Sequence, residues 1–222
     1  MGKLVYEHSI KQYILNNPHL FIPKNSQSKV MFEKSINFGS TICDVLIFNS
    51  INQEVGIEIK TGHDSVKRLP KQLKDYAKVC DYLWVFVHDS LLDDVIKVIN
   101  QLNMPFIGIV SYFEVDGEIA SGIIREARYN STSSSYMACM MMWSTELKVM
   151  ARALAKDRKQ NINRLTRKSQ YIKYMLKQLN DHKVKKYLTY FILDNQSDPN
   201  KTYNDFKFGS DVTWDYSQEA KK

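Results

Sequence analysis

The chain has 222 residues, of which 44% are hydrophobic and 25% are charged, and its formal net charge is +7. This composition supports one sizeable core with room for a smaller appended unit, and it argues against a disordered chain. The three cysteines are far apart and lack CxxC or Cys/His spacing, so neither a disulfide framework nor a zinc site is expected. No signal-peptide pattern is present, and no apolar run approaches the roughly 20 residues of a membrane span. We therefore expect a soluble protein of the cytoplasm.

The first part of the chain predicts helices that alternate with strands. An amphipathic helix is expected over 6–17, followed by strands over 30–38, 43–48 and 54–61. A helix over 70–80, a strand over 82–87, a helix over 89–102 and a hairpin over 106–128 complete this part. Short turns join the first three strands into an antiparallel meander, and the helix over 70–80 makes a right-handed parallel crossover. The sequence predicts an α/β core over 1–128, in which helices flank a mixed central sheet.

The composition changes after this core. Residues 129–136 are rich in Ser and Thr and have no hydrophobic periodicity, which is typical of a linker. From 137 to 194 we expect a helical subdomain, with amphipathic stretches over 143–160, 169–180 and 183–194. The run Met140–Trp143 is interpreted as core of these helices, with a partner-binding surface as the alternative. The tail over 195–222 is polar with scattered aromatic residues, and either docking or disorder fits it.

Positive charge is concentrated in the helical subdomain. Residues 146–186 contain 13 Lys and Arg and 3 Asp and Glu, a net charge of +10 that leaves −3 for the rest of the chain. A segment of this kind suits a polyanion, because each phosphate that it neutralises releases counterions. The alternative is a solvated helix face. The candidate nucleic-acid contacts are Lys148, Arg152, Lys156, Lys159, Arg164 and Arg167.

Two acids and a lysine fall on neighbouring predicted strands. Asp44 stands near the start of one strand, and Glu58 and Lys60 are two residues apart on the next, hence on one face. Mg²⁺ takes hard oxygen ligands, usually one or two carboxylates together with phosphate and water. Asp44, Glu58 and the carbonyl of Ile59 are therefore candidate ligands. Lys60 is the candidate to orient an attacking water and to stabilise charge on phosphorus.

The pair Glu58 and Lys60 alone also fits an exposed strand face with alternating charges. The next helix adds Gln72 and Tyr76, which are four residues apart and so share a face. They could present an amide and a phenol to a phosphate or to a metal-bound water. The alternatives are a solvated surface position for Gln72 and a core-edge aromatic for Tyr76.

In this order, the residues resemble the PD-(D/E)XK nuclease superfamily, which has the restriction-endonuclease-like fold, and especially its RecB-like branch. The resemblance covers about residues 5–112 and includes Asp44, Glu58-x-Lys60 and Gln72-x-x-x-Tyr76. It extends to small bacterial and phage members whose role is undefined. It implies that the two acids bind Mg²⁺ or Mn²⁺, that the lysine is catalytic, and that the following helix supports the site or touches substrate.

Two further positions bear on this resemblance. Glu7, in the first helix, matches a position at which an acid often assists the metal site in the superfamily. Its alternative is an acid that the helix dipole favours in a first turn. Cys43 stands where the superfamily's name places proline, which is a departure at a variable position.

The resemblance implies a metal-dependent deoxyribonuclease with DNA as its partner, although RNA is not excluded. A catalytically silent nucleic-acid-binding or protein-interaction module on the same fold is the alternative. No membrane partner is expected. The sequence leaves open endo- or exonucleolytic cutting, substrate specificity, and whether a second copy or another protein takes part.

Overall fold

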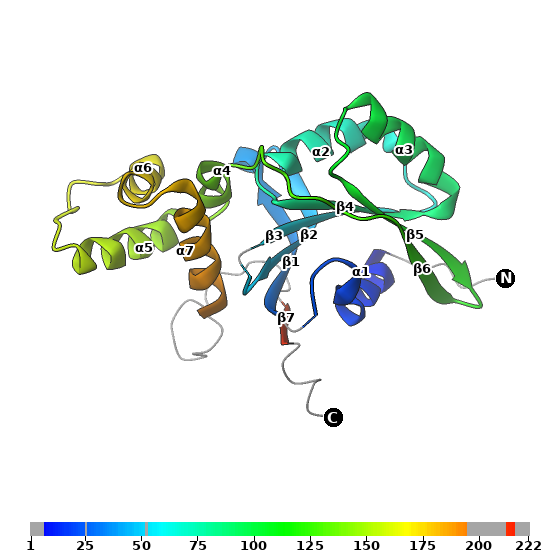
Figure 1. The fold of residues 1–222 in the computed structure, drawn as a ribbon, viewed down its shortest axis with the longest axis horizontal. Helices are drawn as coiled ribbons and strands as arrows, with labels where there is room; N and C mark the ends of the chain where they lie inside the picture. The colour runs from blue at the N-terminus through cyan, green and yellow to red at the C-terminus, as the bar shows by residue number, and fades with distance from the viewer. Residues whose placement is uncertain (1–6, 25, 52, 195–211, 216–222) are drawn as a thin grey trace.

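The computed structural model describes residues 7–24, 26–51, 53–194 and 212–215. It is an α/β fold built on one seven-stranded mixed sheet with helices on both faces (Figure 1). The strands are β1 (Gln27–Ile36), β2 (Thr41–Asn49), β3 (Glu54–Lys60), β4 (Tyr82–His88), β5 (Gly108–Val115), β6 (Glu118–Arg125) and β7 (Val212–Asp215). The helices are α1 (Glu7–Asn16), α2 (Leu69–Ala77), α3 (Leu92–Gln101), α4 (Ser135–Met140), α5 (Ser144–Asp157), α6 (Lys168–Gln178) and α7 (Asp181–Asp194). The predicted fold class is confirmed.

The order of the strands is β6-β5-β4-β3-β2-β1-β7. The strands β1, β2 and β3 form the predicted antiparallel meander, and β3, β4 and β5 are parallel, joined through α2 and α3. A tight turn leads from β5 to antiparallel β6, with left-handed φ values at Asp116 and Gly117. The segment β7 pairs antiparallel with β1 at the sheet edge. The rest of the predicted tail lies outside the described residues.

The sheet separates two hydrophobic clusters. On one face α1 packs its Ile10 and Ile14 toward β4 and β5. On the other face, α2 and α3 pack with the helices that follow the sheet in sequence. The strand β3 alternates accordingly: Ile57 and Ile59 belong to the α1 side. Glu58 therefore points to the α2 side, because successive strand residues face opposite ways.

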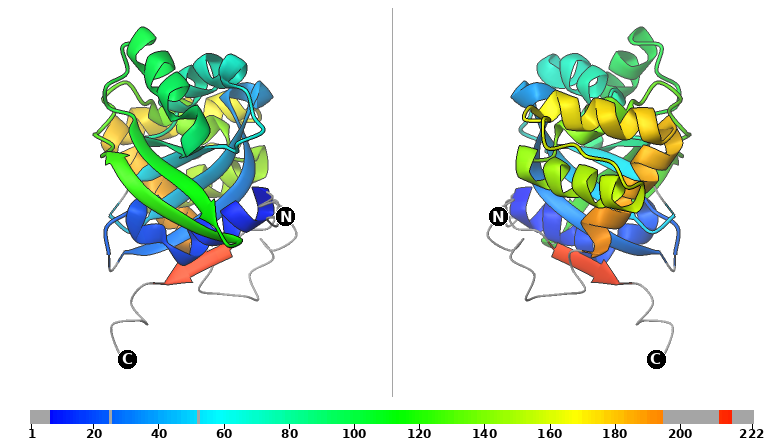
Figure 2. Two further views of the ribbon diagram at one scale, coloured as in Figure 1. Left: turned by 90° about the vertical axis from the view of Figure 1, so that its right-hand side faces the viewer. Right: turned by 90° about the vertical axis from the view of Figure 1, so that its left-hand side faces the viewer.

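The helices α4–α7 pack into the same hydrophobic cluster as α2 and α3, on one face of the sheet (Figure 2). The Ser/Thr-rich stretch that leads to them is fastened to the sheet by its side chains. Asn130 is buried, and its Nδ2 donates to the carbonyls of Ala77 (2.7 Å) and Cys80 (2.9 Å). Ser135 donates to the carbonyl of Asp181 over 2.7 Å. Among the described residues, no helix is both long enough and apolar enough to cross a membrane.

Candidate active site

The candidate site lies where β2 and β3 part. Their antiparallel pairing runs from Phe48 and Glu54 to Val45 and Ile57, and it stops one step before Asp44 would face Glu58. Asp44 bridges the gap, because its Oδ2 accepts the main-chain N–H of Ile59 over 2.8 Å. The carboxylate thus satisfies a backbone donor that continued pairing would have used.

Tyr76 of α2 reaches into this fork. Its hydroxyl lies 2.5 Å from Glu58 Oε2 and 3.2 Å from the carbonyl of Ile42, and it accepts the N–H of Asp44 over 3.0 Å. A phenol has one hydrogen to donate, and the shorter contact assigns it to Glu58. Because the Tyr76 side chain is wholly buried, its hydroxyl contacts Glu58 and the main chain of β2 but no substrate surface. Tyr76 is therefore a positioning residue in this arrangement.

Lys60 lies on the same face of β3 as Glu58 and pairs with it. Its Nζ donates to Glu58 Oε1, and to Gln72 Oε1 of α2 over 3.2 Å. Glu58 is 1% exposed and Lys60 is 4% exposed, so these two charges are held out of water and need each other. Glu58 and Lys60 therefore do not lie on an exposed strand face, which was the alternative interpretation of the sequence. Gln72 is half-buried and bonded to Lys60, so it is not a fully solvated surface residue.

Gly56 lets α2 approach closely enough for these contacts. A Cβ at this position would meet the Cys80 sulfur at 2.7 Å and the Tyr76 ring at 3.2 Å. Real Cβ atoms do not approach other atoms as closely as the first of these distances, so a larger residue would push the end of α2 away from β3. The glycine thus helps to set the position of the Tyr76 hydroxyl.

Burial raises the pKa of Asp44 to about 7, and repulsion from Glu58 acts in the same direction. The Ile59 N–H and the charge of Lys60 oppose this shift. Glu7 of α1 adds a smaller upward effect, which places it within electrostatic reach of Asp44, although it is exposed and paired with Lys11 at 2.9 Å. A partly buried acid with a raised pKa beside other charged groups is common at functional sites.

The donor set suits a hard cation that keeps part of its coordination for water and substrate. The second oxygen of Asp44 accepts no hydrogen bond from the described residues. The carbonyl of Ile59 points to the same side of β3 as the N–H that meets Asp44, as strand geometry requires. Glu58 is already bonded to Tyr76 and Lys60. The described residues contain no group of three or more His, Cys, Asp or Glu placed to hold a metal, so any metal here depends on non-protein ligands as well.

The predicted nucleic-acid residues fall into two groups. Lys148 and Arg152 of α5 line a hollow of about 310 Å³ between this helix and the connection to α6. The others are exposed and spread over the end of α5 and that connection; they are Lys156, Lys159, Arg164 and Arg167. Figure 1 shows α5 and α6 on the side of the molecule away from α3. The structure therefore does not gather all six into one site.

Residues 1–205 match the profile of the family described as bacteriophage P4 protein cII. The chain belongs to this family. No curated protein matches it. A protein of unknown function from Silicibacter pomeroyi has a similar structure, with a TM-score of 0.42 and 13% identity, over 72% of this chain and 99% of that chain.

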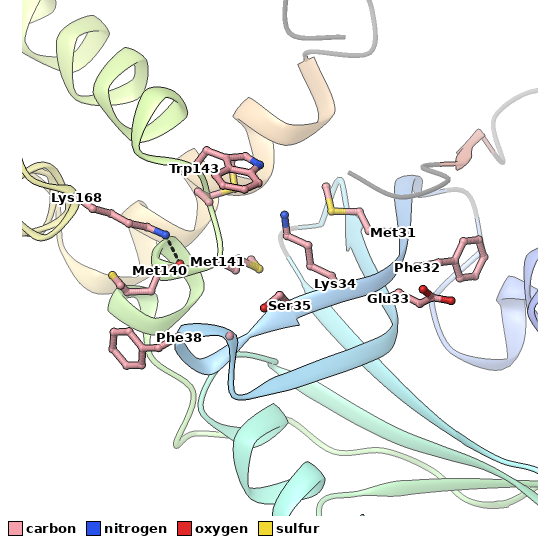
Figure 3. A pocket seen from close by; sticks show the side chains of 12 residues that line it. Met31, Phe32, Glu33, Lys34, Ser35, Phe38, Met140, Met141, Trp143 and Lys168 are labelled. Carbon is pink, nitrogen blue, oxygen red and sulfur yellow. Dashed lines mark hydrogen bonds between the residues drawn. The ribbon is translucent and has the colours of Figure 1, made fainter. Parts of the chain in front are cut away.

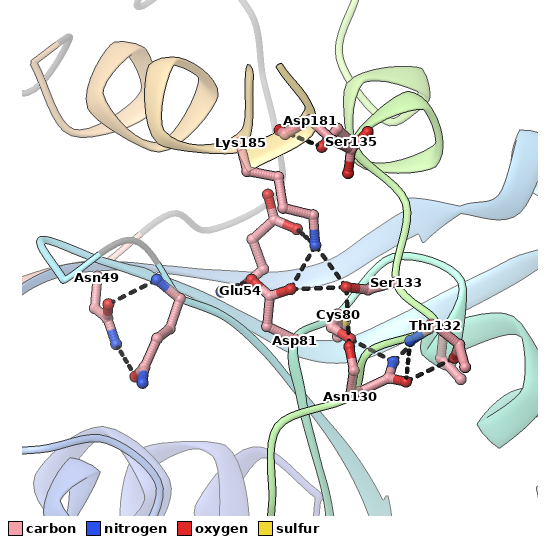
Figure 4. A network of polar contacts seen from close by, with 12 residues as sticks. Asn49, Glu54, Cys80, Asp81, Asn130, Thr132, Ser133, Ser135, Asp181 and Lys185 are labelled. Atoms are coloured by element: carbon pink, nitrogen blue, oxygen red, sulfur yellow. Dashed lines mark hydrogen bonds and ion pairs between the residues drawn. The ribbon is translucent and has the colours of Figure 1, made fainter. Parts of the chain in front are cut away.

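Sequence reasoning missed a second charged network in this cII-family protein (Figure 4). Lys185 of α7 donates to Asp81 and to Ser133 (2.7 Å), and it lies 3.5 Å from Glu54 at the start of β3. Glu54 and Glu58 are four residues apart on one strand, which is a signal that both face the same layer. Lys185, which the sequence counted in the basic segment, is only 6% exposed and faces the sheet instead.

Proposed function

We propose that this cII-family protein is a metal-dependent deoxyribonuclease that hydrolyses phosphodiester bonds. The observation that carries the proposal is the convergence of Asp44, Glu58 and Lys60 where β2 and β3 part. Holding the charges of Glu58 and Lys60 out of water is costly, and apolar residues of similar size would often stabilise the fold as well or better. A costly group of acids and a lysine beside an opening in the sheet therefore supports a catalytic role.

Each residue would have a defined part in the reaction. Asp44 and Glu58 would hold Mg²⁺ or Mn²⁺ together with the carbonyl of Ile59, and Glu7 would add negative charge from α1. The bound metal would polarise the phosphate and lower the pKa of a water molecule. Lys60 would orient the attacking water and stabilise charge on phosphorus. Gln72 and Tyr76 position Lys60 and Glu58 through the hydrogen bonds described above.

The substrate that we propose is DNA, held in part by the cations of α5 and of its connection to α6. Lys148, Arg152 and Lys156 lie on α5, and none of them is within salt-bridge distance of an acid among the described residues. Their charge therefore remains available to phosphates. We place the activity in the cytoplasm. The three cysteines are free and buried, which fits a reducing compartment.

One observation favours the silent binding module as a second candidate. Both oxygens of Glu58 are already hydrogen-bonded, to Lys60 and to Tyr76. A metal would therefore share or displace one of these partners. The two candidates differ in whether DNA is cut, so a cleavage assay separates them.

The test is cleavage of plasmid and linear DNA with Mg²⁺ or Mn²⁺ by the wild-type protein and by Asp44→Asn and Lys60→Met. We expect each substitution to lower the rate by about 100- to 1,000-fold, because each removes a group aimed at the reacting phosphate. Asp94 and Lys97 form an exposed ion pair at 3.1 Å on α3, so Asp94→Asn and Lys97→Met are matched controls. Equal rates in all five proteins would refute the mechanism. Tight binding with no cutting by the wild type would leave the silent module.

A further inference from the structure

The solvent-facing side of α2 carries a row of lysines. They recur every three or four residues, from the short turn before the helix to its C-terminal end, and therefore share one face; they are Lys67, Lys71, Lys74 and Lys78. All four are exposed. Gln72 and Tyr76, which contact Lys60 and Glu58 of the candidate active site, lie on another face of the same helix.

The four lysines line a hollow of about 770 Å³, which we call the α2 hollow. Met104, which precedes β5, and Thr132, in the stretch over 129–136, also border it. Its volume lies within the range of ligand-binding clefts in proteins. Four of its nine lining residues are lysines, so an anionic partner fits it better than an apolar one.

One acid lines the α2 hollow, and donors already surround it. Asp75 is 5% exposed and accepts hydrogen bonds from Lys71 over 3.0 Å and from Lys78 over 2.9 Å. At the tip of the β1–β2 hairpin, Asn37 (2.7 Å) and Thr41 (2.5 Å) donate to the same carboxylate. Burial alone would raise the pKa of Asp75, but the hydrogen bonds from Thr41, Lys78 and Lys71 lower it to about 2. The carboxylate therefore stays charged and holds two of the lysines in place.

The remaining charge of the α2 hollow is positive. Four lysines against one aspartate leave a net charge of +3. The amines of Lys67 and Lys74 have no hydrogen-bond or ion-pair partner among the described residues. Like charges three or four residues apart on a helix destabilise it. A bound polyanion would relieve this repulsion, because its own charge would neutralise the lysines.

A second hollow beside the same hairpin tip has a different character. It measures about 460 Å³ and lies between the tip and the junction of α4 and α5 (Figure 3). Two lysines border it, but Lys34 is only 8% exposed, and the half-buried Lys168 donates to the Met140 carbonyl. The lysines of the α2 hollow, in contrast, are all exposed, so their charge is open to a large partner.

The α2 hollow lies close to the candidate active site. The amine of Lys71 donates to the carbonyl of Ser40 over 2.9 Å, just before β2 begins. Asp44 follows four residues later, so no more than about 14 Å of strand separates this contact from the proposed metal ligand. A substrate as long as DNA can therefore span both.

We propose that the α2 hollow binds the phosphate backbone of duplex DNA, with the amines of Lys67 and Lys74 on its phosphates. This inference rests on the proposed nuclease function, to whose substrate it assigns a contact surface besides α5. The lysine row spans roughly 17 Å along the helix. Each DNA strand carries one phosphate per about 3.4 Å of axis, so the row passes several of them. None of the described residues that line the hollow is aromatic, so it offers no base stacking to a single strand.

The test measures binding of labelled duplex DNA and of oligo(dT) over a range of salt concentrations, without metal and in an Asp44→Asn background. We expect Lys67→Gln/Lys74→Gln to weaken duplex binding about 10- to 60-fold at about 0.1 M salt. The slope of log affinity against log salt should fall by roughly 1.8, because each lost phosphate contact removes about 0.9. Oligo(dT) binding should fall less. Lys74→Arg keeps the charge and should keep the affinity.

The matched control is Lys173→Gln/Lys177→Gln, which removes the same charge from two exposed lysines of α6. Figure 1 shows α6 well apart from α2. Because the amines of Lys67 and Lys74 have no described partner, their double variant should keep the melting temperature of the parent protein. In an otherwise wild-type protein with Mg²⁺, the same double variant should raise KM for DNA cleavage and leave kcat unchanged, since it removes binding away from the reacting phosphate.

Unchanged duplex affinity in Lys67→Gln/Lys74→Gln would overturn this inference. So would an equal loss in the control, because binding would then follow net charge alone, or a loss confined to oligo(dT). These results do not depend on cutting. DNA binding through the α2 hollow by a wild-type protein that cleaves nothing would overturn the nuclease proposal alone. Cleavage whose KM is the same with and without the two lysines would overturn the α2 hollow alone.

Discussion

Two buried networks on strand β3 contain the same chemical groups but differ in their proposed roles. Glu54 and Glu58 lie on the same face of β3, and each lies close to a lysine, Lys185 and Lys60 respectively. The Glu58 network includes Asp44, which is partly exposed where the sheet opens. The Glu54 network is closed by α7 and by the stretch over 129–136 (Figure 4). Access to the acids, rather than their type, separates the candidate catalytic site from a structural brace.

The Glu54 network joins four segments of the chain. Lys185 of α7 donates to Asp81, which precedes β4, and to Ser133. Glu54 is wholly buried, and neither of its oxygens accepts a hydrogen bond from the described residues. Burial raises its pKa to about 8, against the opposing charge of Lys185. With Glu54 protonated, Lys185 and Asp81 remain as a buried ion pair, so the buried charges balance.

The largest expected effect is on stability, from loss of the lysine in the closed network. Lys185→Met leaves Asp81 buried without its cation, and such a loss costs about 3–5 kcal/mol. Urea unfolding would measure the change. Lys183→Met, an exposed position on the same helix, is the matched control and should change stability little. A wild-type midpoint for Lys185→Met would mean that the network does not brace α7 against the sheet.

The second prediction compares the two lysines in DNA cleavage, where we expect Lys60 and not Lys185 to matter. Lys60→Met should lower DNA cleavage by about 100- to 1,000-fold, whereas Lys185→Met should keep its rate per folded molecule. The reason is that the charge of Lys60 acts on Asp44, which is partly exposed, whereas Lys185 pairs with the buried acids Asp81 and Glu54. Cleavage under single-turnover conditions, corrected for the folded fraction, separates the two lysines. Similar losses in both variants would show that the two networks do not divide the roles in this way.

The sequence predicted much of this arrangement for local reasons. Short hairpins fix which strands are neighbours, and the two-residue period fixes which side chains share a face, so Asp44 and Glu58 were expected to meet. The stripe on the second helix predicted the face on which Tyr76 lies. It did not predict that the hydroxyl would lie in the fork between β2 and β3, because this depends on how closely Gly56 lets α2 approach.

Contacts between distant segments could not be predicted. Lys185 and Asp81 are 104 residues apart, and no local pattern records their pairing. From the sequence alone, Lys185 is therefore counted as one more cation of the basic segment over 146–186. The sequence predicts that Asn130 belongs to a linker. In the structure its side chain donates to main-chain carbonyls at the end of α2, and main-chain acceptors have no sequence signature. Within the Met140–Trp143 run, Met141 and Met142 are core as expected, while Trp143 faces the solvent.

The third prediction concerns pH. Glu54 has an ordinary pKa of 4.5 when unfolded and about 8 when folded, so the folded state holds the proton more tightly. Its contribution to stability is full below the lower value and is lost as the pH rises through the higher one, on the order of a few kcal/mol. Glu54→Gln cannot lose a proton, so its unfolding free energy should decline less across this range. Parallel pH profiles for wild type and variant would place Glu54 in an ionised state throughout.

The smallest expected effect is that of Gly56→Ala, which tests whether the two networks are coupled through α2. Gly56 lies between Glu54 and Glu58, and a methyl group there must displace the Cys80 sulfur and press on the Tyr76 ring. We expect Gly56→Ala to cost about 1–3 kcal/mol, as overpacking typically does, and to lower cleavage by moving Tyr76 away from Glu58. Gly122→Ala in β6 is the matched control, because its Cβ would meet nothing within 4 Å. Reduced stability with unchanged cleavage would show that Glu58 keeps its position without the Tyr76 hydroxyl, and the site would then depend on Lys60 and Gln72 alone.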